Sequence, residues 1–248
     1  MKISILMPIY DCPSDLLLKA IKSITSQSYQ DWEILIRDGC LNRPAIENPE
    51  VKNLLDTECQ KIVYYLEEDG RDDIAHRSGV YTALNWGMRR ATGDIFSFQS
   101  GDDERGDSEV LACVNERFEK HGPSPFLIYG DCDKIRKDGS LDVVVPPGQM
   151  RPVSNPITYE EMMQSNMLCT PAVFWNRAVI EKFGYFDETY DWAADIDYWL
   201  RIWKGVDKEY LPQSIGKYRD WEVSGNVKNT SRVEEQAAEI WKKYGRKI

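Results

Sequence analysis

The sequence lacks the patterns that identify several classes of protein. Six cysteines occur without a Cys-x-x-Cys pair and only two histidines are present, so the spacing of a zinc site is absent. No G-x-G-x-x-G motif or glycine-rich phosphate loop follows the first apolar stretch, which argues against a dinucleotide site and a nucleotidyltransferase. The scattered cysteines are expected to be reduced, as in a cytosolic protein.

Long apolar runs and an excess of basic residues are also missing. The first residues, MKISILMPIY, precede the polar DCPSD and show no signal-peptide cleavage pattern. No later run approaches the length that spans a membrane. The formal net charge of −10 opposes binding to nucleic acid. We therefore expect a cytoplasmic protein that binds no nucleic acid.

The first hundred residues alternate between predicted strands and helices. The strands are expected at 3–7, closed by Pro8, and at 32–39, 61–68 and 94–100; the helices at 13–27, with Ser14 as cap, 51–59 and 80–91. This order predicts an α/β fold with a Rossmann-like, mostly parallel central sheet flanked by helices, in a single domain.

The second half is less regular. Helices are expected at 108–122, 159–164, 177–183, 192–204 and 233–245. Strands are expected at 126–131 and 142–146, joined by the turn KDGS.

Carboxylates follow three of the predicted strands. Asp38 ends the second strand, Asp102 and Asp103 follow the fourth, and Asp131 ends FLIYGD. Ligands of open α/β sheets bind at the carboxyl ends of the strands. Two adjacent carboxylates repel each other unless they share a proton or a cation, so this pair indicates a divalent cation, with a solvated turn as the alternative.

Four segments in order, MPIYD, WEILIRDG, GVYTALNWGMRRATGDIFSFQSGDD and GYFDETYDWAADIDYWLR, resemble the family 2 glycosyltransferases of the GT-A fold. The most specific part, Gly79 to Asp103, is similar to the family pattern G-I-Y-D-A-M-N-K-G-I-x-x-A-T-G-D-I-I-x-F-L-N-S-D-D. The resemblance implies a GT-A domain over 1–224, with a nucleotide-sugar half (1–103) and an acceptor half (104–224). Residues 225–248 would form an amphipathic helix packed on the same domain.

The resemblance also implies an activity and a site. The activity is inverting transfer of a hexosyl or hexosaminyl group, in polysaccharide biosynthesis, from a nucleotide-diphosphate sugar, UDP-type by preference. The acceptor would be a hydroxyl of a saccharide or lipid-linked saccharide. Mg²⁺ or Mn²⁺ would bind at Asp103, and Asp195 in AADIDYWLR would be the general base. The implied donor-binding residues are Pro8, Tyr10, Asp38, Asn85 and Asp102.

The sequence departs from the family pattern without losing the metal carboxylate or the base. The departures are Arg37, Thr82, Gly101, Thr170, Pro171 and Trp221. The donor sugar therefore cannot be copied from any relative. The alternative function is a catalytically degenerate GT-A protein that binds a sugar nucleotide or scaffolds a polysaccharide-assembly complex.

Several side chains keep two interpretations. Asn85 either touches the donor or lies on a helix surface, and Asp197 and Arg201 either support the site or form a surface ion pair. Trp192 is either an acceptor-sugar platform or core. Arg71 and Arg77 either approach a pyrophosphate or lie in a solvated loop. Tyr198, Trp199 and Trp203 form either an aromatic ridge or part of the core. The basic end KKYGRKI is either a peripheral contact with the inner face of a membrane or a solvated helix end.

Overall fold

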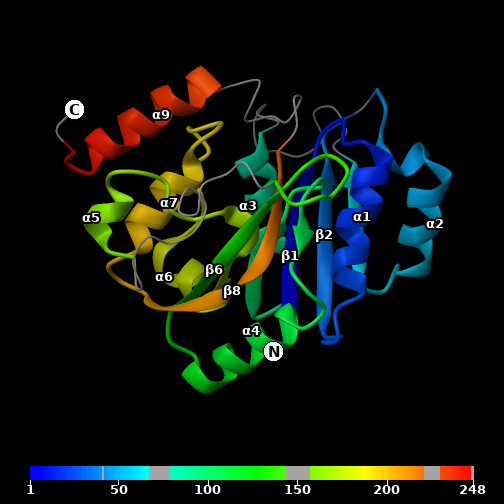
Figure 1. The fold of residues 1–248 in the computed structure, drawn as a ribbon, viewed down its shortest axis with the longest axis horizontal. Coiled ribbons are helices and arrows are strands. Elements are labelled where there is room, and N and C mark those ends of the chain that lie inside the picture. The colour runs from blue at the N-terminus through cyan, green and yellow to red at the C-terminus, as the bar shows by residue number, and fades with distance from the viewer. Residues whose placement is uncertain (41, 67–78, 143–156, 221–229, 247–248) are drawn as a thin grey trace.

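The computed structural model describes residues 1–40, 42–66, 79–142, 157–220 and 230–246. Within them, eight strands form one sheet in the order β3-β2-β1-β4-β7-β6-β8-β5 (Figure 1). The strands are β1 (Ile3–Ile9), β2 (Trp32–Asp38), β3 (Ile62–Leu66), β4 (Ile95–Phe98), β5 (Glu104–Arg105), β6 (Phe126–Ile135), β7 (Val173–Asn176) and β8 (Asp207–Arg219).

The strand pairs are parallel in the first half of the chain and mixed in the second. β1 pairs with β2 and β4, β2 with β3, and β6 with β8, all in parallel. β7 is antiparallel to β4 and β6, and β5 is antiparallel to β8. The single-domain α/β fold with a mostly parallel sheet, predicted from the sequence, is confirmed.

Helices cover both faces of this sheet. They are α1 (Ser14–Thr25), α2 (Pro49–Thr57), α3 (Val80–Arg90), α4 (Val110–His121), α5 (Tyr159–Met162), α6 (Arg177–Phe183), α7 (Ala194–Ile202) and α9 (Thr230–Lys243), with short 3₁₀ turns η1 (Ala45–Glu47) and η2 (Thr170–Ala172). Figure 1 shows α1 and α2 on the opposite side of the sheet from α5, α6, α7 and α9.

Two hydrophobic cores lie between the sheet and these helices. Ile3, Ile5 and Met7 of β1 pack with α1, α2 and α4, whereas Leu6 packs with α3, α6, α7 and α9. This alternation is the period of a strand, and burial on both faces explains why β1 is almost continuously apolar. α9 joins the second core through Ala237 and Ile240. The predicted boundaries at 103 and 224 stay predictions.

The ends of two elements differ from the sequence prediction. β1 continues through Pro8 to Ile9. Ile9 accepts a hydrogen bond from Gly39 on the β2 side, so the missing N–H of Pro8 faces the β4 side, where pairing ends at Phe98. Ser14 does not cap α1, because Pro13 occupies the cap position and no side-chain cap hydrogen bond forms.

The sequence prediction also missed β7 and β8 and ended β6 too early. Asp131 lies inside β6, next to a β-bulge opposite Ser214 of β8, and so is not a strand end. The register along β8 skips Pro212 and Gln213 at this irregularity. A proline and a polar residue at a bulge remove the alternation that would predict a strand.

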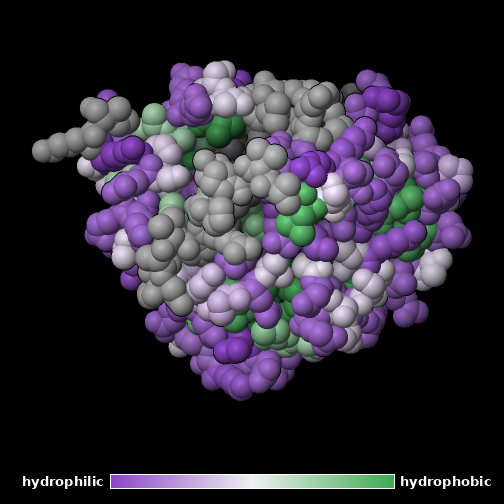
Figure 2. Space-filling model, viewed as in Figure 1, coloured by the Kyte–Doolittle hydropathy of each residue, from purple (hydrophilic) through white to green (hydrophobic). Residues whose placement is uncertain are grey.

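No helix in the part of the chain that the structure describes has both the length and the apolar character needed to cross a bilayer. Figure 2 shows a mostly hydrophilic face on which hydrophobic residues appear in small separate groups.

A buried carboxylate fastens the end of α3 to the start of the sheet. Glu33 accepts hydrogen bonds from Ser4 Oγ (2.7 Å) and from the Thr92 backbone N–H (2.7 Å), and Lys2 Nζ lies 2.9 Å away. A Cβ at Gly93 would lie 2.4 Å from Ser4 Oγ, so this approach requires glycine. Burial raises the pKa of Glu33, but the bonds from Lys2, Ser4 and Thr92 outweigh it and leave the pKa below its usual value.

We predict that Glu33→Gln lowers the free energy of unfolding at pH 7 by about 1–3 kcal/mol, since buried donors lose a charged acceptor. The pKa of Glu33 is lower in the folded protein than in the unfolded chain. Glu33 therefore stabilises the fold at a pH above its pKa in the unfolded chain, and this stabilisation disappears as the pH falls through its pKa in the folded protein. Urea unfolding at several pH values should show the two proteins converging in acid. The exposed Glu181→Gln is the control, and equal stability of Glu33→Gln and wild type at pH 7 would contradict the assignment.

Candidate active site

Three strands end close together at one edge of the sheet. β1 and β2 are in a register that pairs Ile9 with Asp38, and β4 runs parallel to β1 and ends opposite Leu6. The turn after β4 carries Asp102 and Asp103. The structure therefore brings the three predicted donor-side carboxylates to the same edge.

The loop after β1 packs tightly against that turn. Burial and then the charges of the three carboxylates raise the pKa of the Cys12 thiol, which lies among them. A Cβ at Gly101 would come within 2.5 Å of Ile9 Cγ2 and 3.1 Å of Cys12 Sγ. The glycine that departs from the family pattern is therefore required by the bulk of Ile9 and Cys12.

Asp103 is buried and held by β8. It is 3% exposed, and its Oδ1 accepts a hydrogen bond from the backbone N–H of Arg219 (2.9 Å). Burial and the charge of Asp102 raise the pKa of Asp103 well above its usual value, against the positive charges of Arg219 and Arg105. A carboxylate in this setting is stabilised by an additional cation.

Arg219, which the sequence analysis missed, fixes the turn. Its Nε donates to the carbonyl of Asp102 (2.7 Å), and its Nη1 donates to the carbonyls of Arg136 (2.7 Å) and Lys137 (2.9 Å). Its Nη2 pairs with Glu104. No local pattern in the sequence indicated this role, because the contacts join residues far apart in the chain.

The residues predicted to bind the nucleotide base differ in their exposure to solvent. The ring of Tyr10 is 74% exposed, whereas Asp38 is 1% exposed. Asp38 accepts hydrogen bonds from the backbone N–H groups of Cys40 (2.9 Å) and Ala45 (2.7 Å) and from Tyr64 Oη (2.6 Å). These three hydrogen bonds show that Asp38 shapes its own loop, and its contact with a nucleotide base stays a prediction.

Asp195 occupies the first turn of α7 with a neutral donor on each oxygen. Its Oδ1 accepts from Tyr81 Oη (2.7 Å) and its Oδ2 from Asn166 Nδ2 (3.1 Å). Burial raises the pKa of Asp195, and the bonds from Tyr81 and Asn166 oppose that rise. Neither donor was predicted from the sequence. Tyr81 lies in the GVYTALNWG segment that resembles the family pattern, whereas no sequence pattern points to Asn166.

Asn85 is buried against the segment that precedes α7. Its Nδ2 donates to the carbonyl of Phe186 (3.0 Å) and to Glu188 Oε1 (2.7 Å), and its Oδ1 accepts from the Phe186 N–H (3.0 Å). Thr82, another departure from the family pattern, donates to Glu188 Oε2 (3.1 Å). Asn85 is 1% exposed, so it is not a helix-surface residue, and its contact with the donor stays a prediction.

The aromatic residues of α7 and its end belong to the core. Tyr198 and Trp199 are fully buried and Trp203 is 2% exposed, which confirms the core interpretation. Trp192, just before α7, is half-buried, and its acceptor-platform role stays a prediction.

Asp197 is not part of a surface ion pair. It is 1% exposed and contacts Lys243 Nζ (2.7 Å), Tyr244 Oη (3.0 Å) and Arg201 Nε (3.4 Å). Two residues of the basic end KKYGRKI therefore contact the domain. Lys243 is directed at α7, and Arg246 donates to the carbonyl of Gln164 (3.0 Å). Peripheral membrane association stays a prediction.

The Cys169 thiol lies within the electrostatic field of both predicted catalytic carboxylates. Burial and contact with Cys132 raise the pKa of Cys169, and the charges of Asp103 and Asp195 raise it further. All six cysteines are free, as predicted.

The carboxylate pair supplies only part of a metal shell. Within the described ranges, no group of three or more His, Cys, Asp or Glu side chains could hold a metal ion. Mg²⁺ commonly binds through one or two carboxylates together with phosphate oxygens and water. Asp102 and Asp103 fit a cation shared with a diphosphate. Arg71, Arg77 and Trp221 lie outside the described residues.

Comparison with known sequences indicates the family. Residues 4–124 match the family model described as glycosyl transferase family 2. An uncharacterized glycosyltransferase of Rickettsia felis is 24% identical over 248 residues, 98% of this chain and 38% of its own length. A PGL/p-HBAD biosynthesis glycosyltransferase of Mycobacterium bovis is 24% identical over 219 residues, 85% of this chain and 73% of its own. The chain spans well under half the length of the Rickettsia relative.

Comparison with solved structures shows the fold. S. aureus TarS 1-349 in complex with UDP-GlcNAc superimposes with a TM-score of 0.70 at 15% identity, over 97% of this chain and 66% of that one. The same protein in complex with UDP gives a TM-score of 0.67 at 14% identity, over 97% of this chain and 65% of that one. Residues 4–124 are therefore similar to glycosyltransferase family 2, and the chain has the GT-A fold.

Proposed function

We propose that this protein is an inverting glycosyltransferase that moves a hexosyl or hexosaminyl group from a UDP-type sugar donor to a hydroxyl of a saccharide or lipid-linked saccharide. One observation carries the proposal: Asp38, Asp102 and the buried Asp103 lie at the edge where β1, β2 and β4 end, which is where open α/β sheets bind ligands. TarS, which shares the fold, has been solved with UDP and UDP-GlcNAc, and this supports a uridine donor.

The donor would bind at the carboxyl edge of β1, β2 and β4. The exposed ring of Tyr10 offers a stacking surface for the base. Asp38 would accept a hydrogen bond from the N–H of the nucleotide base, and Asp102 would contact the ribose or metal-bound water. Asp103 would hold Mg²⁺ or Mn²⁺ together with the diphosphate. When bound, the cation would neutralise charge on the leaving diphosphate.

Asp195 would act as the general base. Tyr81 and Asn166 each donate to one of its two oxygens, so they fix the orientation of the carboxylate that would face the acceptor hydroxyl. The acceptor oxygen bonds to the anomeric carbon as the bond from that carbon to the diphosphate oxygen breaks. The hydroxyl proton passes to Asp195, and the nucleoside diphosphate leaves.

Nucleotide binding tests the donor site directly. We expect UDP with Mn²⁺ to raise the melting temperature more than UDP alone, since the cation shields the diphosphate from Asp102 and Asp103. GDP, dTDP and CDP, each with and without Mn²⁺, form the comparison panel. If no nucleotide shifts the melting temperature under either condition, the transferase proposal fails and a scaffold role is favoured.

The two carboxylates should separate binding from turnover. Asp103→Ala should abolish Mn²⁺-dependent UDP binding. Asp195→Asn should leave that binding near normal but reduce sugar transfer, or UDP release to water, by about a hundredfold or more. The exposed Asp107→Asn is the control, and an equal loss of binding in both site variants would reject the division of roles.

The rate should depend on the protonation of Asp195. The base acts only when deprotonated and burial raises its pKa, so kcat should fall at a higher pH than for an ordinary carboxylate. The Tyr81 hydrogen bond lowers the pKa of Asp195, so Tyr81→Phe should move the acid limb of the kcat profile to higher pH. An acid limb that stays in place would show that Asp195 does not control it.

A further inference from the structure

α9 contacts the chain on both sides of Asp195. Figure 1 shows it crossing above α7 and α5, far from the edge formed by α1 and α2. Only Ala237 and Ile240 among its residues are buried. Its remaining described contacts with the domain are polar or made at its last turn, so they determine how the helix is oriented.

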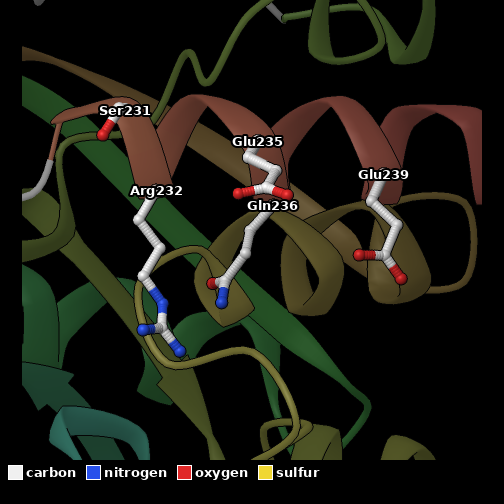
Figure 3. Close-up of a pocket in the computed structure, with 5 residues that line it drawn as sticks. All are labelled: Ser231, Arg232, Glu235, Gln236 and Glu239. Atoms are coloured by element: carbon white, nitrogen blue, oxygen red, sulfur yellow. The ribbon is translucent and has the colours of Figure 1, made fainter.

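The first half of α9 holds the segment that enters α7. Gln236 Oε1 accepts a hydrogen bond from the backbone N–H of Trp192 (2.9 Å), and Arg232 pairs with Asp191. Figure 3 shows that Arg232 and Gln236 extend from the same side of the helix, where they line a pocket with Ser231, Glu235 and Glu239. The carbonyl of Trp192 accepts from Tyr81 Oη (3.3 Å), the group that also binds Asp195.

The last turn of α9 holds α7 just beyond Asp195. Lys243 Nζ lies 2.7 Å from Asp197 Oδ1, and Tyr244 Oη lies 3.0 Å from the same oxygen. The hydrogen bond with Asp197 raises the pKa of Lys243, so Lys243 keeps its positive charge at neutral pH. Asp195 is thus flanked at positions 191–192 and 197 by contacts with one helix.

A third set of contacts reaches the segment before Asn166, the second hydrogen-bond donor to Asp195. Trp241 Nε1 donates to the carbonyl of Met162 (3.2 Å), and Arg246 donates to the carbonyl of Gln164 (3.0 Å). These carbonyls precede Asn166, which donates to Asp195 Oδ2. Residues 191–197, which contain Asp195, and residues 162–166, which contain its donor Asn166, therefore both form hydrogen bonds with α9 or the residues just after it.

We propose that α9 positions the general base, with Gln236 and Lys243 as positioning residues that fix the segment around Asp195. This inference rests on the proposed function for its effect on rate, but its structural part stands on the contacts alone. Neither side chain contacts the donor-side carboxylates in the described structure. Their loss should therefore affect the chemical step rather than donor binding.

The experiment uses the full chain with Gln236→Met, Gln236→Glu and Lys243→Met. Gln236→Glu keeps an acceptor for the Trp192 N–H and should rescue. Lys242→Met removes the same charge one residue away, from an exposed side chain, and is the control. The readouts are UDP release from UDP-GlcNAc, UDP-glucose and UDP-galactose with Mn²⁺, and amide hydrogen exchange of residues 190–197 and 99–105.

For Gln236→Met and Lys243→Met, we expect kcat to fall about tenfold with the donor KM within about twofold of wild type. Exchange of 190–197 should accelerate while exchange of 99–105 stays unchanged, and Gln236→Glu should restore both readouts. If both variants match Lys242→Met in exchange and kcat, the positioning role is overturned. If wild type releases no UDP, the proposed function fails, and the exchange comparison alone decides whether α9 holds this segment.

Discussion

The hydrogen bond from the backbone N–H of Arg219 to Oδ1 of Asp103 joins the end of β8 to the turn after β4. Asp103 is buried beside a second carboxylate, so its ionised form depends on fixed donors. β8 also packs closely on η2, because a Cβ at Gly216 would lie 2.7 Å from the backbone of Pro171. η2 begins at Thr170, shortly after Asn166, which donates to Asp195 Oδ2. The turn that carries Asp103 and the segment near Asp195 therefore share one support.

The surroundings of the two buried carboxylates suit them to different tasks. Asp103 has a carboxylate neighbour, whose charge raises its pKa, so a cation would relieve the repulsion. Asp195 has neutral donors on both oxygens, and burial is the main cause of its raised pKa. Asp195 can take up a proton without any change in the surroundings of Asp103. The contrast between charged and neutral neighbours is therefore the physical basis for assigning metal binding to one and base chemistry to the other.

The sequence predicted the first half of the fold well because buried parallel strands and amphipathic helices leave clear periodic patterns. β8 escaped prediction because Pro212 and a bulge interrupt its pattern. The site divides in the same way. Asp38 and Asp103 follow strands, and their location could be predicted from that alone. Asn166 and Arg219 act through contacts with residues 29 and 116 positions away, and such long-range pairing leaves no local signal.

The buried charge of Asp197 supports an orienting role for α9 over a purely stabilising one. Its partner Lys243 is 46% exposed, and an ion pair that solvent reaches adds little to stability. An apolar contact, however, would let α9 slide along α7, whereas Asp197 accepts from Lys243 and Tyr244 at defined positions. The direction of these hydrogen bonds fixes the register of the two helices. Asp195 lies two residues away on the same helix, so the register of α9 against α7 is also a constraint on the base.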